Sequence, residues 1–391
     1  MSRTNESEIS GQPHFPPVPN VYRNKTVLVT GHTGFKGTWL SIWLKALGGQ
    51  VIGYSLEPNT QPSVFEVTQL ENKITHIIGD IRDENHLNDV FQQYNPEFVF
   101  HLAAQSLVRE SYKDPKLTYE SNVIGLVYLF EVIRKTNSVR VVINVSSDKC
   151  YENKEWVWGY RENDPMGGYD PYSSSKGCSE LITSAYRRSF FNDNEDSCVV
   201  LASARAGNVI GGGDWAEDRI IPDCIRSLTT KKPILIRNPN AIRPWQHVLE
   251  PLSGYLWLGA LLHNNGKDYA SGWNFGPREN QSLPVKEIVE RMIQIWGEGS
   301  WTTPQDVHAQ PHEANYLKLD CSKAYRLLKW QAIYDIHETI VNTINWYKSY
   351  YYDSVDMFDL CLKQITNYVE TAKKENLLWA STLDIKPNSK V

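Results

Sequence analysis

The chain contains few cysteines, and their spacing is as informative as their number. Six occur among 391 residues, and no two of them form the C-x-x-C pair on which many zinc sites are built. Scattered cysteines in a chain of this length also argue against a disulfide framework, which is typical of short secreted domains. We therefore expect reduced thiols, no metal site and a cytoplasmic location.

The sequence also lacks an excess of basic charge and any long apolar run. Its formal net charge is −5, and it contains no long block of lysine and arginine that would attract a nucleic acid backbone. The longest apolar stretches, such as residues 255–262, are far shorter than the ~20 residues that cross a bilayer, and the N-terminus has no apolar signal core. Neither nucleic acid nor a membrane is an expected partner.

What the sequence does contain is an alternation of strand-like and helix-like segments. The strand-like runs are residues 26–30, 50–56, 74–81, 97–103, 139–145 and 197–204. This order predicts an α/β fold with a doubly wound parallel sheet, a Rossmann fold, over residues 21–205. We expect residues 1–20 to be a flexible leader and residues 206–350 to form a smaller, mixed α/β substrate domain interleaved with the first. Residues 351–391 should be a C-terminal helix and tail, the helix running from about residue 349 to 375.

A glycine-rich loop follows the first predicted strand. The strand ends at Thr30, Gly31, Gly34 and Gly37 follow at a spacing of three, and a helical pattern begins at once. Glycines at such a turn let the backbone approach a pyrophosphate, which the unpaired N–H groups at a helix N-terminus favour. The loop predicts a dinucleotide site; the alternative, a tight turn with no ligand, is less favoured.

A second polar cluster follows a buried strand in the middle of the chain. The apolar run that ends at Val145 is followed by Ser146, Ser147, Asp148 and Lys149, and the carboxyl ends of parallel strands face the ligand crevice. Further on, Tyr172 and Lys176 are four residues apart and share one face of a predicted helix. A cation beside a phenol lowers its pKa, so we expect Lys176 to make Tyr172 a usable base. Taken alone, such a pair is more often a half-buried ring beside a solvated lysine.

The glycine spacing resembles that of the extended short-chain dehydrogenase/reductase family, and other segments match it too. The resemblance makes Ser147, Tyr172 and Lys176 the catalytic serine, tyrosine and lysine of that family. It also implies that Asp80 and Ile81 contact the adenine and that Asn122 is a structural asparagine. The full set of cofactor residues that it implies is Gly31, Thr33, Gly34, Phe35, Lys36, Gly37, Ser55, Asp80, Ile81, Leu102, Ala103, Ala104, Asn122, Tyr172 and Lys176.

The run from Ser146 to Asn153 narrows the resemblance to the nucleotide-sugar 4,6-dehydratases. Many of these enzymes carry Thr-Asp-Glu or Thr-Ser-Glu at this point, whereas the branch that acts on CDP-glucose carries Ser-Asp-Lys, as here. The similarity covers roughly residues 25–350. It implies CDP-glucose as the substrate, oxidised at C4, dehydrated across C5 and C6, and reduced at C6. Asp148 and Lys149 are then the candidates for the acid and base of the elimination; whether Lys149 is the C5 base or only stabilises the enolate stays open.

The later matching segments supply candidate substrate contacts. Asn208, Arg219 and Arg243 offer an amide and two guanidinium groups, and the planar fork of arginine suits a pyrophosphate. The rings of Trp215 and Trp245 are candidates for stacking on the base or sugar. Residues in or next to the matching segments complete the expected set, namely Gln105, Ser106, Asp214 and His247.

The expected cofactor is NAD, with NADP less favoured. The second strand ends at Ser55, Leu56 and Glu57 without the aspartate that usually holds the adenosine ribose. No arginine or lysine lies within residues 54–59 to bind a 2′-phosphate, although Lys36 remains a candidate for that role. The resemblance also implies a homodimer, formed through a four-helix bundle, or a homotetramer.

Two other functions remain open at this point. A nucleotide-sugar 4-epimerase would use the same serine, tyrosine and lysine but has no need for Asp148 and Lys149. A non-catalytic protein would keep the dinucleotide site as a redox sensor, although such a binder has no use for an intact catalytic set.

Overall fold

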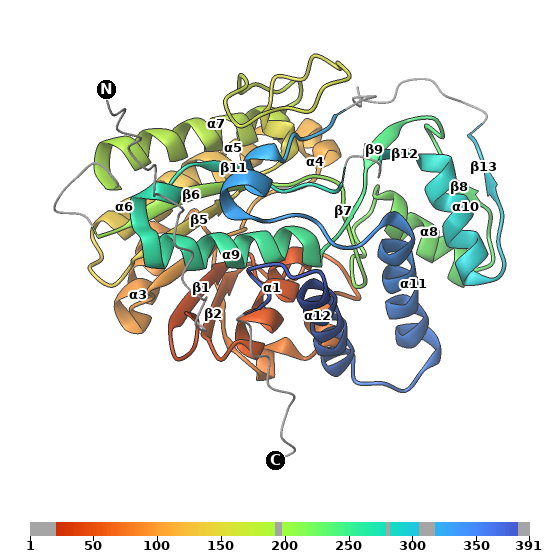
Figure 1. The fold of residues 1–391 in the computed structure, drawn as a ribbon, viewed down its shortest axis with the longest axis horizontal. Helices are drawn as coiled ribbons and strands as arrows, with labels where there is room; N and C mark the ends of the chain where they lie inside the picture. Colours follow the sequence, from red (N-terminus) through yellow and green to blue (C-terminus); the bar gives the residue numbers. More distant parts are fainter. Residues whose placement is uncertain (1–20, 192–197, 279–281, 305–316, 382–391) are drawn as a thin grey trace, which may run out of the picture.

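Seven parallel strands form the centre of the protein. The computed structural model describes residues 21–191, 198–278, 282–304 and 317–381, so the predicted leader and the end of the tail lie outside the described residues. The sheet has the order β11-β6-β5-β4-β1-β2-β3 (Figure 1). Its strands are β1 (Thr26–Thr30), β2 (Gln50–Ser55), β3 (Thr75–Ile78), β4 (Phe98–His101), β5 (Val141–Val145), β6 (Val200–Arg205) and β11 (Gly272–Asn274).

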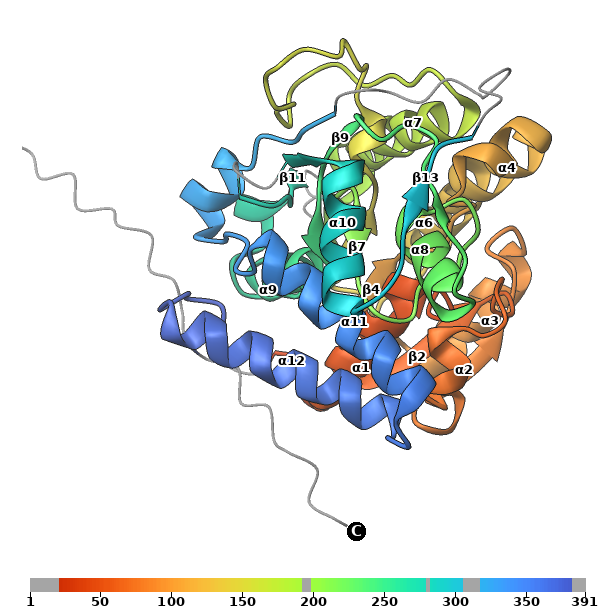
Figure 2. The same ribbon diagram turned by 90° about the vertical axis from the view of Figure 1, so that its right-hand side faces the viewer.

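Helices cover both faces of this sheet, which confirms the predicted doubly wound fold. One face packs against helices α1 (Phe35–Ala46), α9 (Leu249–Asn265) and α12 (Met357–Lys374), whose side chains form the larger apolar core. The other face packs against α3 (Glu84–Tyr94), α6 (Gly125–Arg134) and part of α7 (Pro171–Tyr186). Figure 2 shows α12 lying beside α1, which it contacts. The shorter helices near the sheet are α2 (Val64–Val67), α4 (Val108–Lys113) and α5 (Pro115–Tyr119).

The segment after β6 is built from short strand pairs and helices beside the sheet (Figure 1). Strand β7 (Val209–Ile210) pairs with β10 (Gln246–His247), β9 (Ile242–Pro244) with β12 (Ser282–Pro284), and β8 (Ile234–Leu235) with β13 (Trp301–Thr302). The helices here are α8 (Ile220–Thr229), α10 (Val285–Trp296) and α11 (Ile336–Tyr352). Strand β11 also comes from this segment, so the central sheet is completed by residues that lie well beyond β6 in the sequence.

The expected single helix over residues 349–375 is wrong. The structure has two helices there, because α11 ends at Tyr352 and α12 starts after Asp356, whose carboxylate accepts hydrogen bonds from the N–H groups of Phe358 and Asp359. Such an N-cap begins a new helix. Among the residues described here, we find no helix with the length and apolar character needed to cross a membrane.

The order of the strands brings four loops together at one edge of the sheet. Strands β1, β4, β5 and β6 are neighbours and run in the same direction. Their carboxyl ends lead into the glycine-rich loop, residues 101–104, residues 146–149 and residues 205–208. In open α/β sheets this edge is where ligands bind.

A buried carboxyl group joins α9 to the C-terminal helices. Glu250 accepts hydrogen bonds from the backbone N–H groups of Ile333 and Tyr334 at 3.0 and 2.7 Å and from the Tyr368 hydroxyl at 2.6 Å. Burial raises the pKa of Glu250 to about 7, although these three donors favour its charged form. The carboxyl group thus fixes the chain before α11 and the middle of α12 against the helix that covers the sheet.

We expect Glu250→Ala to destabilise the protein by about 3 kcal/mol, because it leaves two buried N–H groups and one buried hydroxyl without their acceptor. Denaturant unfolding at constant pH measures this loss. The matched variant Tyr368→Phe removes only one of the three hydrogen bonds and should cost about 1 kcal/mol. Equal losses in the two variants would contradict the role assigned to the carboxyl group.

Candidate active site

The glycine-rich loop packs closely against backbone atoms of Leu102 and Ala103. Gly31 has a φ of +75°, and a Cβ there would approach Ala103 N to 2.7 Å. A Cβ on Gly37 would come within 2.0 Å of the Gly31 carbonyl oxygen. Gly34 is the N-cap of α1 and has no side chain to cover the first-turn N–H groups. These residues therefore form a cradle that suits a pyrophosphate, with Thr33 and Phe35 beside it.

Hydrogen bonds hold the other predicted cofactor residues around this cradle. Thr33 Oγ1 lies 2.9 Å from Ser55 Oγ at the end of β2. The Arg82 guanidinium approaches Asp80 to 2.6 Å and holds the pKa of that carboxyl group below its usual range. Ile81 is buried against Gly125. The site thus has a carboxylate at the end of the third strand and a hydroxyl at the end of the second.

Asn122 links the loop after β4 to α7. Its amide group donates to the Gln105 carbonyl at 2.9 Å and to Ser175 Oγ at 2.9 Å, and its Oδ1 accepts from Gln105 N at 2.8 Å. Nearby, the N–H groups of Leu102 and Ala103 each approach Thr30 Oγ1 to 3.2 Å, and Ala104 follows them in the same loop. Asn122 therefore positions the helix that carries Tyr172.

Lys36 extends away from the adenosine end of the cradle. Its pKa is lowered to about 8, mainly by burial and also by the nearby cations Lys176 and Arg219, while Asp148 opposes this shift. These neighbours belong to the catalytic end of the site, whereas the adenosine ribose of such folds lies beyond β2. This placement argues against Lys36 as a partner for a 2′-phosphate.

The polar run after β5 forms a short turn. Ser147 caps the 3-10 turn η3 (Asp148–Cys150): its Oγ accepts from Lys149 N at 3.3 Å and donates to Asp148 Oδ1 at 3.0 Å. Asp148 is buried and Lys149 is half-buried. A Cβ on Gly207, at the end of β6, would lie 1.8 Å from Asp148 Oδ2. The absence of a side chain at position 207 therefore makes the space for this carboxyl group.

Tyr172 and Lys176 lie one turn apart near the start of α7. Asp170 caps this helix by accepting from Ser173 N at 2.9 Å, and Pro171 is its first residue. Both functional side chains are buried, and Lys176 Nζ lies 6.0 Å from the centre of the Tyr172 ring. A hydrogen bond with Ser147 completes the expected serine-tyrosine contact.

The expected effect of Lys176 on Tyr172 is not found. The pKa of Tyr172 is raised to about 12, mainly by burial and also by the nearby Asp148 carboxyl group, while the Ser147 hydrogen bond and Arg219 oppose this rise. The pKa of Lys176 is itself lowered by burial to about 8. Desolvation penalises the charged form of each group and is the largest cause of both shifts.

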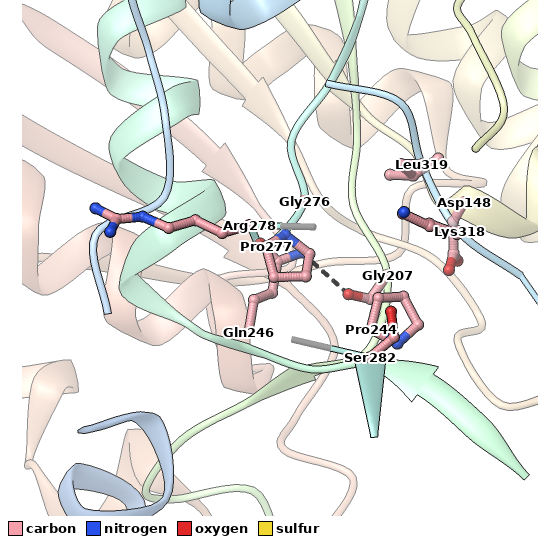
Figure 3. Close-up of a pocket in the computed structure, with 10 residues that line it drawn as sticks. All are labelled: Asp148, Gly207, Pro244, Gln246, Gly276, Pro277, Arg278, Ser282, Lys318 and Leu319. Atoms are coloured by element: carbon pink, nitrogen blue, oxygen red, sulfur yellow. Dashed lines mark hydrogen bonds between the residues drawn. The ribbon is translucent and has the colours of Figure 1, made fainter. Parts of the chain in front are cut away.

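A small cavity, partly open to solvent, adjoins the η3 turn (Figure 3). Figure 3 shows the side chain of Arg278 extending away from it, consistent with hydrogen bonds from Arg278 to Ala332 O and Glu375. The residues that line it are Asp148, Gly207, Pro244, Gln246, Gly276, Pro277, Arg278, Ser282, Lys318 and Leu319. Of these, the sequence analysis assigned a role only to Asp148.

The predicted substrate residues fall into three groups. Arg219 forms an ion pair with Asp214 at 2.8 Å and lies 3.5 Å from Ser106 Oγ. Its charge also lowers the pKa of Tyr172. These residues therefore lie together at the site. Gln105 lies beside them through its bonds to Asn122. Asn208 and Arg243 do not line the cavity, although their sequence neighbours Gly207 and Pro244 do.

The other three predicted substrate residues, Trp215, Trp245 and His247, do not line the cavity. Trp215 packs within 5.1–5.7 Å of the rings of Trp346, Tyr347 and Tyr350. Trp245 is buried and donates to Leu283 O, and His247 lies between Trp39 and Tyr334. For Trp245 and His247 the sequence offered a signal. Successive side chains of a strand point to opposite faces, and these two residues flank Gln246, which does line the cavity.

The fold and this arrangement define an extended dehydrogenase-like nucleotide-sugar enzyme. The family described as GDP-mannose 4,6 dehydratase matches residues 28–343, and the chain belongs to it. It is 50% identical to CDP-glucose 4,6-dehydratase from Salmonella typhimurium over 91% of this chain and 99% of that protein. It is 26% identical to dTDP-glucose 4,6-dehydratase from Haemophilus influenzae over 82% of this chain and 97% of that protein.

Solved structures of related enzymes share the fold. A dTDP-glucose 4,6-dehydratase from Bacillus anthracis in complex with NAD aligns with a TM-score of 0.66 at 20% identity, covering 83% of this chain and 97% of that one. UDP-glucose 4-epimerase from Thermus thermophilus in complex with NAD aligns with a TM-score of 0.69 at 21% identity, covering 83% of this chain and 99% of that one. At these identities the likeness establishes the fold alone.

We expect Gly207→Ala to lower turnover by on the order of 10²-fold, because the new methyl group would displace the Asp148 carboxyl group. Steady-state kinetics with a nucleotide-sugar substrate measures this. Gly276→Ala is the matched control: it lines the same cavity, but its Cβ would meet only Cys321 Sγ at 3.1 Å and Leu319 beyond it. Full activity in Gly207→Ala would show that the position of Asp148 does not matter.

Proposed function

We propose that this protein is an NAD-dependent CDP-glucose 4,6-dehydratase, which converts CDP-glucose to CDP-4-keto-6-deoxyglucose. The observation that carries the proposal is the buried Asp148, hydrogen-bonded to the same Ser147 that contacts Tyr172. The similarity to the Salmonella enzyme supports the substrate. A 4-epimerase needs the serine, tyrosine and lysine but no further acid or base, so Asp148 and Lys149 favour the dehydratase.

In this proposal the glycine cradle, Ser55 and Asp80 hold the cofactor and Lys176 binds its nicotinamide ribose. Bound NAD would supply a hydride acceptor for C4, the same hydride for C6 later, and a positive ring near Tyr172. That added positive charge matters here, because the pKa of Tyr172 is raised to about 12, mainly by burial. Tyr172 removes the C4 hydroxyl proton and Ser147 hydrogen-bonds the same oxygen.

Elimination requires two further proton transfers after the C4 ketone has acidified the C5 hydrogen. We propose that Asp148, which lies beside Ser147 and is buried, protonates the departing C6 hydroxyl group. Lys149 follows it in the η3 turn. We propose Lys149 as the C5 base, with stabilisation of the developing enolate as its alternative role.

We also propose a homodimer formed through α7 and the helices before α6. Leu181 on α7 is 60% exposed and Ile124, next to α6, is 43% exposed. Apolar side chains on neighbouring helices suit a four-helix bundle between two copies, which a tetramer would repeat. A monomer mass by light scattering would refute this proposal.

A reducing compartment, the cytoplasm, is the proposed location. All six cysteines are free in the structure, and three of them are buried. Titration of the denatured protein without a reductant should find six thiols, and a smaller number would contradict the proposal.

Turnover of CDP-glucose should be redox-neutral. We expect no net accumulation of NADH, transfer of the C4 hydrogen to C6, and a clear preference in kcat/KM for CDP-glucose over dTDP-glucose. Deuterium at C4 and mass analysis of the product test the transfer, with Tyr172→Phe as a control that should lose on the order of 10²–10⁴ of turnover. Stoichiometric NADH release would identify a dehydrogenase, and a C4-inverted sugar an epimerase.

Lys149→Met should retain C4 oxidation but lose elimination. The substitution keeps most of the side-chain length and removes the only group that we assign to C5, so transient NADH should form while exchange of the C5 hydrogen with solvent deuterium stops. Partial rescue by Lys149→Glu, which can accept a proton, would favour the base over the stabilising charge. Elimination at nearly the normal rate in Lys149→Met would exclude both roles.

A further inference from the structure

A buried network of charged and polar groups lies behind the catalytic residues. Glu180 is on α7, one turn after Lys176, and its Oε2 accepts from Arg205 at 2.8 Å and from Ser203 Oγ at 2.7 Å. Both partners of the ion pair are almost fully buried, with side-chain exposures of 5% for Arg205 and 3% for Glu180. The pair therefore fixes α7 to the end of β6.

The same arginine reaches the turn that carries Asp148 and Lys149. Arg205 donates to the hydroxyl group of Tyr151 at 2.6 Å, and that hydroxyl donates to Asn274 Oδ1 at 2.7 Å. Tyr151 directly follows Cys150, the last residue of η3. One guanidinium group thus joins the helix of Tyr172 and Lys176 to the turn of Asp148 and Lys149, with Asn274 at the end of β11 as the far support.

Burying these charged groups costs free energy of folding. Removing two charges from water costs several kcal/mol each, and well-packed apolar residues are often as stable as a buried ion pair. What the arginine adds is geometry, because its planar fork holds two partners at fixed positions. Reactions depend steeply on such positions, since an error of about 1 Å can cost on the order of 10²-fold in rate.

We propose that Glu180, Arg205 and Tyr151 are positioning residues that align the elimination pair, Asp148 and Lys149, with the oxidation pair, Tyr172 and Lys176. The inference rests on the proposed dehydratase function, in which both pairs act on one sugar ring. Oxidation at C4 needs only the α7 residues and Ser147, whereas elimination needs the η3 turn at the correct distance from them. We therefore expect loss of the network to slow elimination more than oxidation at C4.

The network also acts on the charge of Lys176. The titratable groups that face its ammonium are Tyr172, Lys36, His101, Cys150 and Glu180. Burial raises the pKa of Cys150 and lowers that of His101, so both are uncharged near neutral pH. Glu180, whose pKa Arg205 keeps low against the effect of burial, is the anion among them. Its carboxylate therefore helps to keep Lys176 protonated.

The first test is Tyr151→Phe, which removes one hydroxyl group and keeps the ring. Single-turnover experiments with CDP-glucose should show transient NADH formed at nearly the normal rate, while release of the 4-keto-6-deoxy product falls by about tenfold or more and KM is unchanged. Tyr160→Phe is the matched control, because Tyr160 stacks on Tyr151 but its hydroxyl bonds Asn153 and Lys154, outside the network. It should leave both steps unchanged.

The second test is Glu180→Gln, which keeps the shape of the side chain and removes its charge. The limb of the pH–rate profile that falls on the alkaline side should move to lower pH, because Lys176 loses the anion that favours its protonated form. A variant that is only less stable would show a lower melting temperature and an unmoved limb.

The outcomes separate this inference from the proposed function. If the unmodified protein yields no 4-keto-6-deoxy product from CDP-glucose, the function itself is wrong. If it does, and Tyr151→Phe slows oxidation and elimination equally or leaves both unchanged, the positioning role is wrong and the function stands. An unmoved alkaline limb in folded Glu180→Gln would likewise overturn the proposed effect on Lys176.

Discussion

Removal of charged groups from water at the carboxyl edge of the sheet is the main cause of the pKa shifts in the candidate site. Lys36, Lys176 and Arg219 share this space, and burial lowers the pKa of both lysines to about 8. The carboxyl groups that act on these cations are Asp148, Asp214 and Glu180. Buried cations favour an anionic ligand, and a nucleotide diphosphate supplies two negative charges. The same desolvation raises the pKa of Tyr172, so the proposed role of Tyr172 as a base calls for the positive ring of a bound cofactor.

Much of this arrangement follows from local sequence patterns. The strand at Thr26–Thr30 and the helix after the glycine loop lie where the sequence analysis expected them, because β-branched runs and glycine spacing act locally. The fold class is confirmed, and Ser147, Tyr172 and Lys176 meet as the resemblance implied. Their chemical roles stay predictions.

What the sequence did not show depends on contacts between distant segments. The three residues of β11 become a strand only by pairing with β6, and nothing in their own pattern marks them. Trp215 was expected beside the ligand, but the aromatic residues of α11, more than 100 positions later in the chain, enclose it. The pKa of Tyr172 was misjudged for the same reason, since its burial depends on tertiary structure. Glu180 left a signal that was overlooked, as it continues the four-residue spacing of Tyr172 and Lys176.

The position of β11 in the chain has a consequence for how the protein is made. The central sheet cannot be completed, and Asn274 cannot support Tyr151, until the polypeptide has passed through the segment that contains α8 and α9. During synthesis on the ribosome, the nucleotide cradle can therefore assemble early, whereas the catalytic turn acquires its final support only after residue 274 has emerged.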